Sequence, residues 1–505
     1  VPAGNEQYDR RLITPHLEPW AERLGIPSAR LLALGEADHG EPDQDFNLSA
    51  FALRTGGYAN GVSRLNAEVA DRMWRHLFPD LEEGVPAIDA ITNGIHLRTW
   101  LGPEMLGLYE RRLGEGWADR LDEDRSWEEL SELDAEEIWE AHRVQKDRLV
   151  RFARSRLRRQ LGRHGQAPRQ LRALDERPDG RALTIGFARR FATYKRAGLI
   201  FSDIHRLRTL LAHPERPVQI LVAGKAHPAD RPGQDLIRHI FRLSQEPGLR
   251  GRVVFLEDYD LRVGRRLAQG VDLWLNTPKR LMEASGTSGM KAGANGALNC
   301  SVLDGWWPEA ADGSNGWAIG PRELDADAQD EDALDSLALY QLLEEEIVPL
   351  YFERGRDGVP KGWVERMLHV LATVPPVFNT DRMVSEYFSQ AYQNLGRSYF
   401  EYVQDKKERP KRLARDANRI RSGFSKVKIV EAQIADLREI KVGDSIDVRL
   451  DVELGELLSD NVQVELVIGQ RRSISALSAS SPGGSGCGFS GDTAMRLAPR
   501  RMIRT

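Results

Sequence analysis

Short apolar runs alternate with helical patterns from about residue 181 onward. The apolar runs are rich in β-branched residues and read RALTIGFA, VQILVAG, RVVFLE and VDLWLN, whereas GLIFSDIHRLRTLLAH and GQDLIRHIFRLSQ carry helical spacing. Strands that alternate with helices in this way predict an α/β fold, in which helices cover both faces of a parallel sheet. Ligands of such sheets bind at the loops that follow the carboxyl ends of the strands. Here those loops are dense in glycine and polar residues.

The regions on either side of this pattern predict other structures. Residues 1–105 mix short helical patterns with Gly- and Pro-marked loops, and EEIWEAHRVQKDRLVRFARSRLRRQL predicts one amphipathic helix with a charged, solvated surface. Residues 425–470 alternate apolar and polar positions between Gly and Asp turns, which predicts a small antiparallel β module. Residues 471–505 are rich in Ser, Gly and Arg without periodicity, which predicts a disordered tail.

The composition narrows the class of protein. The 505 residues include 71 Lys and Arg against 76 Asp and Glu, a formal net charge of −5, so the chain lacks the basic excess of a general nucleic-acid-binding protein. Two cysteines exclude a disulfide framework and a Cys-rich zinc site. No apolar run of about 18 residues is present, so no membrane span is expected. We expect a cytoplasmic protein without a metal, a nucleic-acid partner or a membrane partner.

The segment EASGTSGMKAGANGALN, residues 283–299, is the most informative part of the sequence. Its small residues let the backbone approach a ligand, and free N–H groups at a helix start bind an anion. Lys291 lies where the first turns of that helix are expected, and its amine suits a phosphate or an aldehyde cofactor. Glu283 suits sugar hydroxyls. The alternative is a flexible turn with Lys291 on a solvated face, and the segment does not fit the P-loop pattern.

Two further segments carry candidate ligand groups. The first, GFARRFATYKRA, follows the first strand of the predicted sheet, and its cations suit a phosphate or a phosphorylated sugar: Arg189, Arg190, Lys195 and Arg196. A solvated helix face is the alternative explanation for such a charge run. The second, ITNGIHLRTW, has a turn signal at Asn93 and Gly94. For Trp100 in this segment, a place in the core and a ligand role both stay open.

Seven segments in order resemble one family. They are NGVSRL, TNGIHLRTW, GFARRFATYKRA, AGKAHPAD, VVFLEDYD, EASGTSGMKAGANGALN and SVLDGWWPE. Together they resemble an α-glucan (glycogen, starch or maltodextrin) phosphorylase of the bacterial type, over roughly residues 1–470. The resemblance implies two Rossmann-like domains of the GT-B type, pyridoxal 5′-phosphate on a lysine, and α-1,4-glucan and inorganic phosphate as substrates. The product would be α-D-glucose 1-phosphate.

The resemblance also implies roles for individual residues. Lys291 matches the lysine that forms the imine with the cofactor, and Arg190 and Lys195 match phosphate-handling cations of the catalytic site. Arg189 stands where the family usually has Lys. Further residues match contacts to the cofactor: Thr287 and Ser288 at its phosphate, Tyr259 near its pocket, and Trp100 against its ring. Others match contacts to the reacting glucose: Asn93, Tyr194, Glu283, Ser285 and Gly286.

Several positions depart from the family pattern. Asn66 stands where the family usually has His, and Asp260 where some relatives have Arg. The opening VPAGN resembles the residues that follow a Thr-His-Thr-Pro segment. We therefore expect an N-terminally truncated chain with an incomplete first domain, inactive alone, and leave a homo-oligomer open. The expected parts are 1–105, remainder of a glucan-binding lobe; 106–175, helical connector; 176–400, Rossmann-like domain with the cofactor site; 401–424, linker; 425–470, β module; 471–505, tail.

Two other functions stay open at this point. A retaining nucleotide-sugar glycosyltransferase of the same architecture would bind a diphosphate at a similar cation loop, but would not need Lys291. A non-catalytic glucan-binding protein would stack sugar rings on exposed aromatic side chains. Four tryptophans are candidates for such stacking, although core packing is the favoured interpretation for them: Trp274, Trp306, Trp307 and Trp317.

Overall fold

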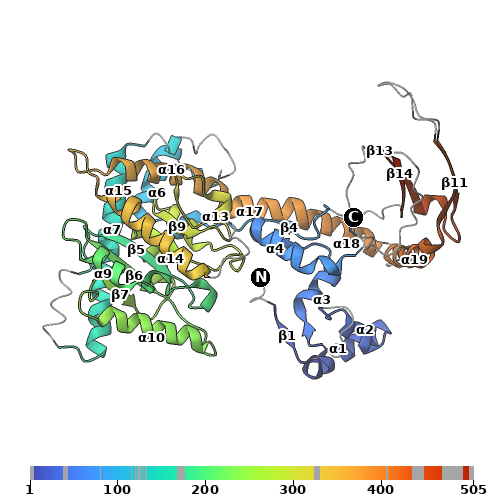
Figure 1. Cartoon of the computed structure of the whole chain (residues 1–505), viewed down its shortest axis with the longest axis horizontal. Helices are drawn as coiled ribbons and strands as arrows, with labels where there is room; N and C mark the ends of the chain where they lie inside the picture. Colours follow the sequence, from blue (N-terminus) through green and yellow to red (C-terminus); the bar gives the residue numbers. More distant parts are fainter. Residues whose placement is uncertain are drawn as a thin grey trace. The chain divides into compact units, whose positions relative to one another are not determined.

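A computed structural model gives the arrangement of the chain (Figure 1). It describes residues 5–37, 44–79, 81–82, 84–114, 116–119, 121, 127, 129–130, 133–167, 177–322, 330–404, 408–434, 448–468 and 493–499. The chain divides into two compact units, Val1–Ser389 and Gln390–Thr505. The first unit contains the parallel sheet and every candidate site residue. The second unit contains the β module.

A six-stranded parallel sheet forms the centre of the first unit. Its order along the sheet is β10-β9-β8-β5-β6-β7, so the chain builds outward from β5 in one direction and then from β8 in the other. This is the strand order of a doubly wound Rossmann sheet, which confirms the predicted α/β fold. The strands are β5 (Leu183–Ala188), β6 (Val218–Ala223), β7 (Val253–Leu256), β8 (Leu273–Asn276), β9 (Leu298–Val302) and β10 (Gly316–Ile319).

Every residue of β5 to β9 is buried, as expected for strands whose two faces are both covered. The helices that follow the strands, coloured green to orange in Figure 1, are α9 (Ile204–Ala212), α10 (Arg231–Gln245), α11 (Leu261–Gly270), α12 (Ser288–Gly293), α13 (Trp307–Ala310), α14 (Glu331–Gln341), α15 (Val348–Phe352), α16 (Lys361–Val377) and α17 (Thr380–Glu386). All four candidate stacking tryptophans are buried in the hydrophobic core, so the favoured interpretation of core packing is confirmed.

The long amphipathic helix predicted from the sequence is α7, Ala135–Arg163. Asp134 caps its first turn by accepting hydrogen bonds from the N–H groups of Glu136 and Glu137. Its buried side chains recur every three or four residues, among them Ile138, His142, Leu149, Ala153 and Leu157. This face packs against α11, against α16 and against α6 (Pro103–Leu113).

The first hundred residues form short elements. β1 (Gln7–Tyr8) pairs with β2 (Phe46–Asn47) in antiparallel fashion, whereas β3 (Asn60–Gly61) pairs in parallel with β4 (Asp89–Ala90). A parallel pair needs a crossover connection, and α4 (Arg64–Trp74) lies in that connection. The other helices of this region are α1 (Arg10–Leu24), α2 (Ser28–Ala33), α3 (Leu48–Thr55) and α5 (Leu97–Trp100).

The second unit begins with α18 (Gln393–Gln404) and α19 (Glu408–Gly423). Two antiparallel pairs follow, β11 (Lys428–Ile434) with β12 (Val448–Glu453), and β13 (Val462–Ile468) with β14 (Thr493–Pro499). Strand β14 falls within the segment predicted to be a disordered tail, and the rest of that segment lies outside the described residues. The domain boundaries drawn from the sequence stay predictions.

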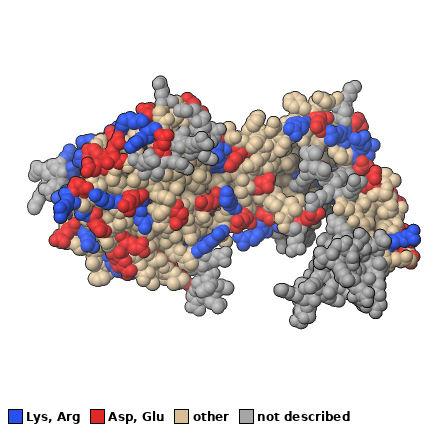
Figure 2. Space-filling model, turned by 90° about the horizontal axis from the view of Figure 1, so that it is seen from above, with Lys and Arg blue, Asp and Glu red and all other residues tan. Residues whose placement is uncertain are grey.

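Two properties of the described residues bear on partners. None of their helices combines the length and the apolar character needed to cross a membrane, and they contain no cluster of His, Cys, Asp or Glu able to hold a metal ion. On the face of the molecule shown in Figure 2, positive and negative side chains are interspersed.

Candidate active site

The loops that follow β5 and β8 meet at one edge of the sheet. These two strands pair in parallel, with Ile185 opposite Leu273 and Gly186 opposite Trp274, so their carboxyl ends point the same way. The strand order reverses between them, and this is the position where open α/β sheets bind their ligands. The loop after β5 carries the predicted cations, and the loop after β8 carries Glu283 and the glycine-rich segment.

Glu283 joins the two loops through ion pairs with two of the predicted cations. Lys195 Nζ lies 2.9 Å from Oε2 and 3.2 Å from Oε1 of Glu283, and Arg189 Nη2 lies 2.6 Å from Oε2. All three side chains are buried. Burial alone would raise the pKa of Glu283, but the charges of Arg189 and Lys195 outweigh it and hold that pKa below its usual value. Burial and the neighbouring Arg189 lower the pKa of Lys195 to about 8, even though Glu283 opposes them.

The four cations of the loop after β5 do not share one environment. Arg189 is also held from β8, because its guanidinium donates to Asn276 Oδ1, while Asn276 Nδ2 donates to Ser301 Oγ at 2.9 Å. Arg190 is exposed. Tyr194 is half-buried, with Lys195 Nζ 4.8 Å from the centre of its ring.

Arg196 points to a different part of the fold. It adopts a left-handed backbone conformation with φ of 44°. Its Nη2 lies 2.6 Å from the buried carboxylate of Asp335, and its Nε donates to the Thr277 carbonyl at 3.0 Å. Arg196 therefore fixes the loop to α14 and to the end of β8, and does not join the cluster around Glu283.

The glycine-rich loop brings its backbone close to neighbouring groups. Gly286 has φ of +82°, a conformation that other residues rarely adopt, and a Cβ on Gly289 would lie 2.5 Å from Asn299 Oδ1. Ser285 Oγ is buried and has no hydrogen-bond partner in the described part of the chain. Buried hydroxyls are nearly always paired, so this one is suited to a ligand. Thr287 precedes α12, and Ser288 Oγ accepts a hydrogen bond from Trp274 Nε1 at 3.3 Å.

Lys291 lies on α12 with its amine over an aromatic ring. Its Nζ is 4.1 Å from the centre of the Trp100 ring, and burial lowers the pKa of this lysine. Two amides that the sequence analysis missed hold Trp100 in place. Asn295 Nδ2 donates to the Trp100 carbonyl at 3.0 Å and to the Lys291 carbonyl at 2.8 Å, and Gln269 Nε2 donates to the Trp100 carbonyl at 3.3 Å. The signal available for Asn295 was its place one helical turn after Lys291.

Tyr259 and Asn93 contribute less directly to this cluster. Tyr259 follows β7, is half-buried, and its hydroxyl would lie 2.7 Å from a Cβ on Gly264 of α11. No hydrogen bond or ring contact between Tyr259 and Lys291 occurs within the described residues. The Asn93 segment is fixed to α13 beside the glycine-rich loop, because Thr92 Oγ1 donates to Glu309 Oε2 at 2.8 Å.

Two of the departures from the family pattern, Asn66 and Asp260, have local structural roles. Asn66 Oδ1 accepts a hydrogen bond from the Val62 N–H at 3.0 Å, at the start of α4. Asp260 caps α11 by accepting from the Val263 N–H at 2.8 Å. Neither side chain takes part in the cluster around Glu283.

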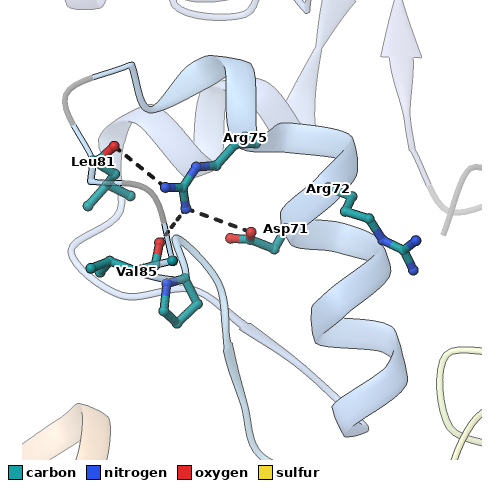
Figure 3. A pocket seen from close by; sticks show the side chains of 7 residues that line it. Asp71, Arg72, Arg75, Leu81 and Val85 are labelled. Carbon is teal, nitrogen blue, oxygen red and sulfur yellow. Dashed lines mark hydrogen bonds and ion pairs between the residues drawn. The ribbon is translucent and has the colours of Figure 1, made fainter. Parts of the chain in front are cut away.

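A cavity of about 580 Å³ lies elsewhere in the first unit. Arg75 points toward Asp71 and toward the carbonyl groups of Leu81 and Val85, whereas Arg72 points away from them (Figure 3). The guanidinium of Arg75 is thus engaged by the chain itself. None of the candidate site residues lines this cavity, whose lining consists of Asp71, Arg72, Arg75, Leu81, Gly84, Val85 and Pro86.

The doubly wound parallel sheet, with Arg189, Lys195 and Glu283 gathered at its switch point, makes this an α/β protein of the Rossmann-like class. Residues 38–313 match the family model for carbohydrate phosphorylase, and the chain belongs to that family. It is 37% identical over 470 residues to the maltodextrin phosphorylase of Thermococcus litoralis, and the matched region covers 93% of this chain and 53% of the relative. The family resemblance seen in the motifs is confirmed.

Two glycogen phosphorylases show similar likeness. The chain is 41% identical over 371 residues to that of Aquifex aeolicus, which covers 74% of this chain and 53% of the relative. It is 35% identical over 477 residues to that of Mycobacterium tuberculosis, and here the matched region covers 93% of this chain and 55% of the relative. The chain therefore spans about half the length of the curated relatives it matches.

Proposed function

We propose that this chain carries the phosphate- and cofactor-binding half of an α-glucan phosphorylase site. The reaction transfers the terminal α-1,4-linked glucosyl unit of glycogen or maltodextrin to inorganic phosphate and yields α-D-glucose 1-phosphate. The observation that carries this proposal is the buried group of Arg189, Lys195 and Glu283 at the switch point of the sheet. It combines cations suited to a phosphate with a carboxylate suited to sugar hydroxyls.

The cations do the electrostatic part of this work. Two phosphates held side by side repel each other, so positive charge must neutralise them. Arg189 and Lys195 supply that charge from buried positions, and Arg190 adds to it from an exposed position in the same loop. Preorganised charges in a site from which water is excluded act more strongly than in water. On the sugar side, the proposed contacts are Glu283, Tyr194, Gly286, Asn93 and the hydroxyl of Ser285, which has no partner among the described residues.

We further propose that Lys291 binds pyridoxal 5′-phosphate. The amine fits this role because burial lowers its pKa and so favours the uncharged, nucleophilic form. Trp100 offers an aromatic surface beside it, and Thr287 and Ser288 lie at the start of α12, where N–H groups favour an anion. Tyr259 would lie at the margin of this cofactor site. When bound, the cofactor supplies a phosphate monoester whose second pKa of about 6 suits it to pass a proton.

We infer that residues 1–105 belong to a second Rossmann-like domain, as in a GT-B arrangement with the glucan bound between two lobes. The βαβ unit formed by β3, α4 and β4 supports this inference, because such units are the repeating element of doubly wound sheets. The expected inactivity of the 505 residues alone belongs to the same proposal.

The proposal is tested by cofactor attachment and by phosphorolysis. The chain is incubated with pyridoxal 5′-phosphate, reduced with borohydride and digested, and mass spectrometry should find the adduct on Lys291. Glucose 1-phosphate is then measured from maltoheptaose and phosphate, with the chain alone and fused to the part of the Thermococcus litoralis relative that it does not span. Glucosyl transfer from a nucleotide sugar, without the Lys291 adduct, would instead support the nucleotide-sugar glycosyltransferase.

A further inference from the structure

The loop that carries Glu283 and Ser285 is fixed through its backbone by one buried carboxylate. Asp304 Oδ2 accepts hydrogen bonds from the N–H of Glu283 at 2.8 Å and from the N–H of Met282 at 3.1 Å. Its Oδ1 accepts from the N–H of Gly305 at 2.8 Å. Asp304 is only 1% exposed. It follows β9, so a strand of the sheet sets the position of the loop after β8.

The residues next to Asp304 hold the remainder of the same loop. The N–H of Trp306 donates to the carbonyl of Ser285 at 2.9 Å. Gly305 has φ of +61°, and a Cβ there would lie 2.3 Å from that carbonyl. From the other side, Ser63 Oγ donates to the carbonyl of Ala284 at 2.7 Å. Each residue from Met282 to Ser285 is therefore fixed by a backbone hydrogen bond, while the Ser285 hydroxyl stays without a partner in the described part of the chain.

We propose that Asp304 is a positioning residue for phosphorolysis. It holds the backbone of Met282 and Glu283 so that the Glu283 carboxylate faces Lys195 and Arg189 and the Ser285 hydroxyl faces the glucosyl unit. This inference rests on the proposed function. Asp304 itself contacts neither of the two cations through a hydrogen bond or an ion pair within the described residues.

The chemistry of the side chain explains why a carboxylate stands here. An ionised carboxylate has two oxygens that only accept, so it satisfies three N–H groups at once. An asparagine of the same shape has one accepting oxygen. Its NH₂ group would face a backbone N–H, so two hydrogen-bond donors would oppose each other. The burial of Asp304 raises its pKa to about 6, and the negative charge of Glu283 contributes to that rise. Keeping this carboxylate ionised at neutral pH therefore costs stability, which points to a role in ordering the loop.

The test compares Asp304→Asn with Asp312→Asn. Asp312 serves as an exposed control, because its carboxylate also accepts backbone hydrogen bonds, from Ser314 at 2.8 Å and Asn315 at 3.1 Å, in a loop outside the site, where it also contacts His369. Hydrogen exchange of the peptide that spans residues 282–290 is measured by mass spectrometry, and glucose 1-phosphate binding by calorimetry. Thermal unfolding of each variant completes the set.

We expect Asp304→Asn to speed exchange of that peptide and to weaken glucose 1-phosphate binding, each by about ten- to a hundredfold, the usual range for a hydrogen bond to a charged group. Its melting temperature should fall below that of Asp312→Asn, because a buried N–H group loses its acceptor, but the variant should stay folded at the temperature of the measurements. Unchanged exchange would overturn the proposal, and so would failure of the variant to fold, because Asp304 would then be structural. If the unaltered chain binds no glucose 1-phosphate, the proposed function fails, while the exchange measurement still decides the role of Asp304.

Discussion

The amine of Lys195 lies 2.9 Å from the carboxylate of Glu283, although 88 residues separate them in the sequence. Arg189 approaches the same carboxylate oxygen at 2.6 Å, so one negative charge serves two buried cations. This arrangement leaves the cluster with a net positive charge in a buried position. An anion such as phosphate would supply the missing negative charge.

Replacing Glu283 with Gln should destabilise the fold. The amide has no charge, so Lys195 and Arg189 would stay buried without their counter-ion. Breaking a buried pair in this way typically lowers the free energy of unfolding by about 3–5 kcal/mol. Urea-induced unfolding followed by tryptophan fluorescence measures this. Glu344→Gln is the control, because Glu344 pairs with Arg206 at 2.6 Å on the exposed surface and should cost less than about 1 kcal/mol. Equal losses for the two variants would contradict the prediction.

The affinity for phosphate should fall as the pH rises through about 8, the pKa to which burial and Arg189 lower Lys195. Above that pH the amine loses its proton and the site loses one positive charge. Phosphate is already mostly a dianion there, so its own titration adds little. Calorimetric titration of the chain with phosphate, repeated between about pH 7 and 9.5, measures this change in affinity.

Lys195→Arg provides the control for this pH dependence, because a guanidinium keeps its charge throughout the range. The stability change has a defined sign as well. The folded-state pKa of Lys195 lies below its ordinary value of 10.5, so the folded state releases its proton first and the stability contribution of this group rises as the pH increases from about 8. A phosphate affinity that stays flat in the unaltered chain would show that Lys195 does not bind the anion.

Much of the fold could be predicted from the sequence, because buried parallel strands leave a local signal. The runs TIGFA, VQILVA and VVFL coincide with β5, β6 and β7, and the cation loop begins directly after β5. The α7 pattern is equally local, since its apolar residues recur at helical spacing. The family motifs further indicated which loops would carry the site.

The contacts between loops could not be predicted, because they depend on the strand order. Glu283 meets Lys195 only because β8 lies beside β5 in the sheet. The same dependence hid Asp304, which reaches the Glu283 loop from the end of the neighbouring strand β9. Arg196 appeared equivalent to Lys195 in the sequence, yet a left-handed backbone turn directs it toward Asp335. Such a turn has no clear signal when the residue is not glycine.

Arg190→Ala and Lys195→Ala should weaken phosphate binding more than glucan binding. Removing a buried charged partner typically costs about 2–5 kcal/mol, and we expect Lys195→Ala to fall in this range. Arg190 is exposed, so solvent screens its charge and its loss should cost less. Kinetics of the fused enzyme, with phosphate varied and then glucan varied, separates the two effects. Equal losses for both substrates would mean that these cations only support the fold.

Lys291→Ala should abolish covalent attachment of pyridoxal 5′-phosphate while the chain stays folded. Thr287 and Ser288 remain in this variant, so weak reversible binding of the cofactor should survive. Cofactor content is measured after extensive dialysis, beside Lys279→Ala, a lysine of the same stretch of the chain that lies outside α12. Stoichiometric retention by Lys291→Ala would sink the assignment of this lysine.

A second buried ion pair lies at the amino ends of β5 and β8, opposite the ends that carry the Glu283 cluster. Lys146 Nζ donates to Asp272 Oδ2 at 2.6 Å, to the Ala182 carbonyl at 2.6 Å and to the Tyr351 hydroxyl at 2.7 Å. His142 Nε2 contacts Asp272 Oδ1 at 2.9 Å. Asp272 and Ala182 directly precede β8 and β5, so this network fixes the start of both strands, whereas Glu283 and Lys195 follow their ends.

Lys146→Met should therefore destabilise the fold without changing the site chemistry. The methionine fills a similar volume but leaves the Asp272 carboxylate buried without its main cation, which should lower the free energy of unfolding by about 3–5 kcal/mol. Adding Asp272→Asn removes that charge as well, so the double variant should recover part of the loss, as a double-mutant cycle in urea would measure. Attachment of pyridoxal 5′-phosphate to Lys291 should persist in both variants below their melting temperatures. If the double variant is as unstable as the sum of the two single ones, Lys146 and Asp272 are not coupled, and the strand starts are held by hydrogen bonds instead.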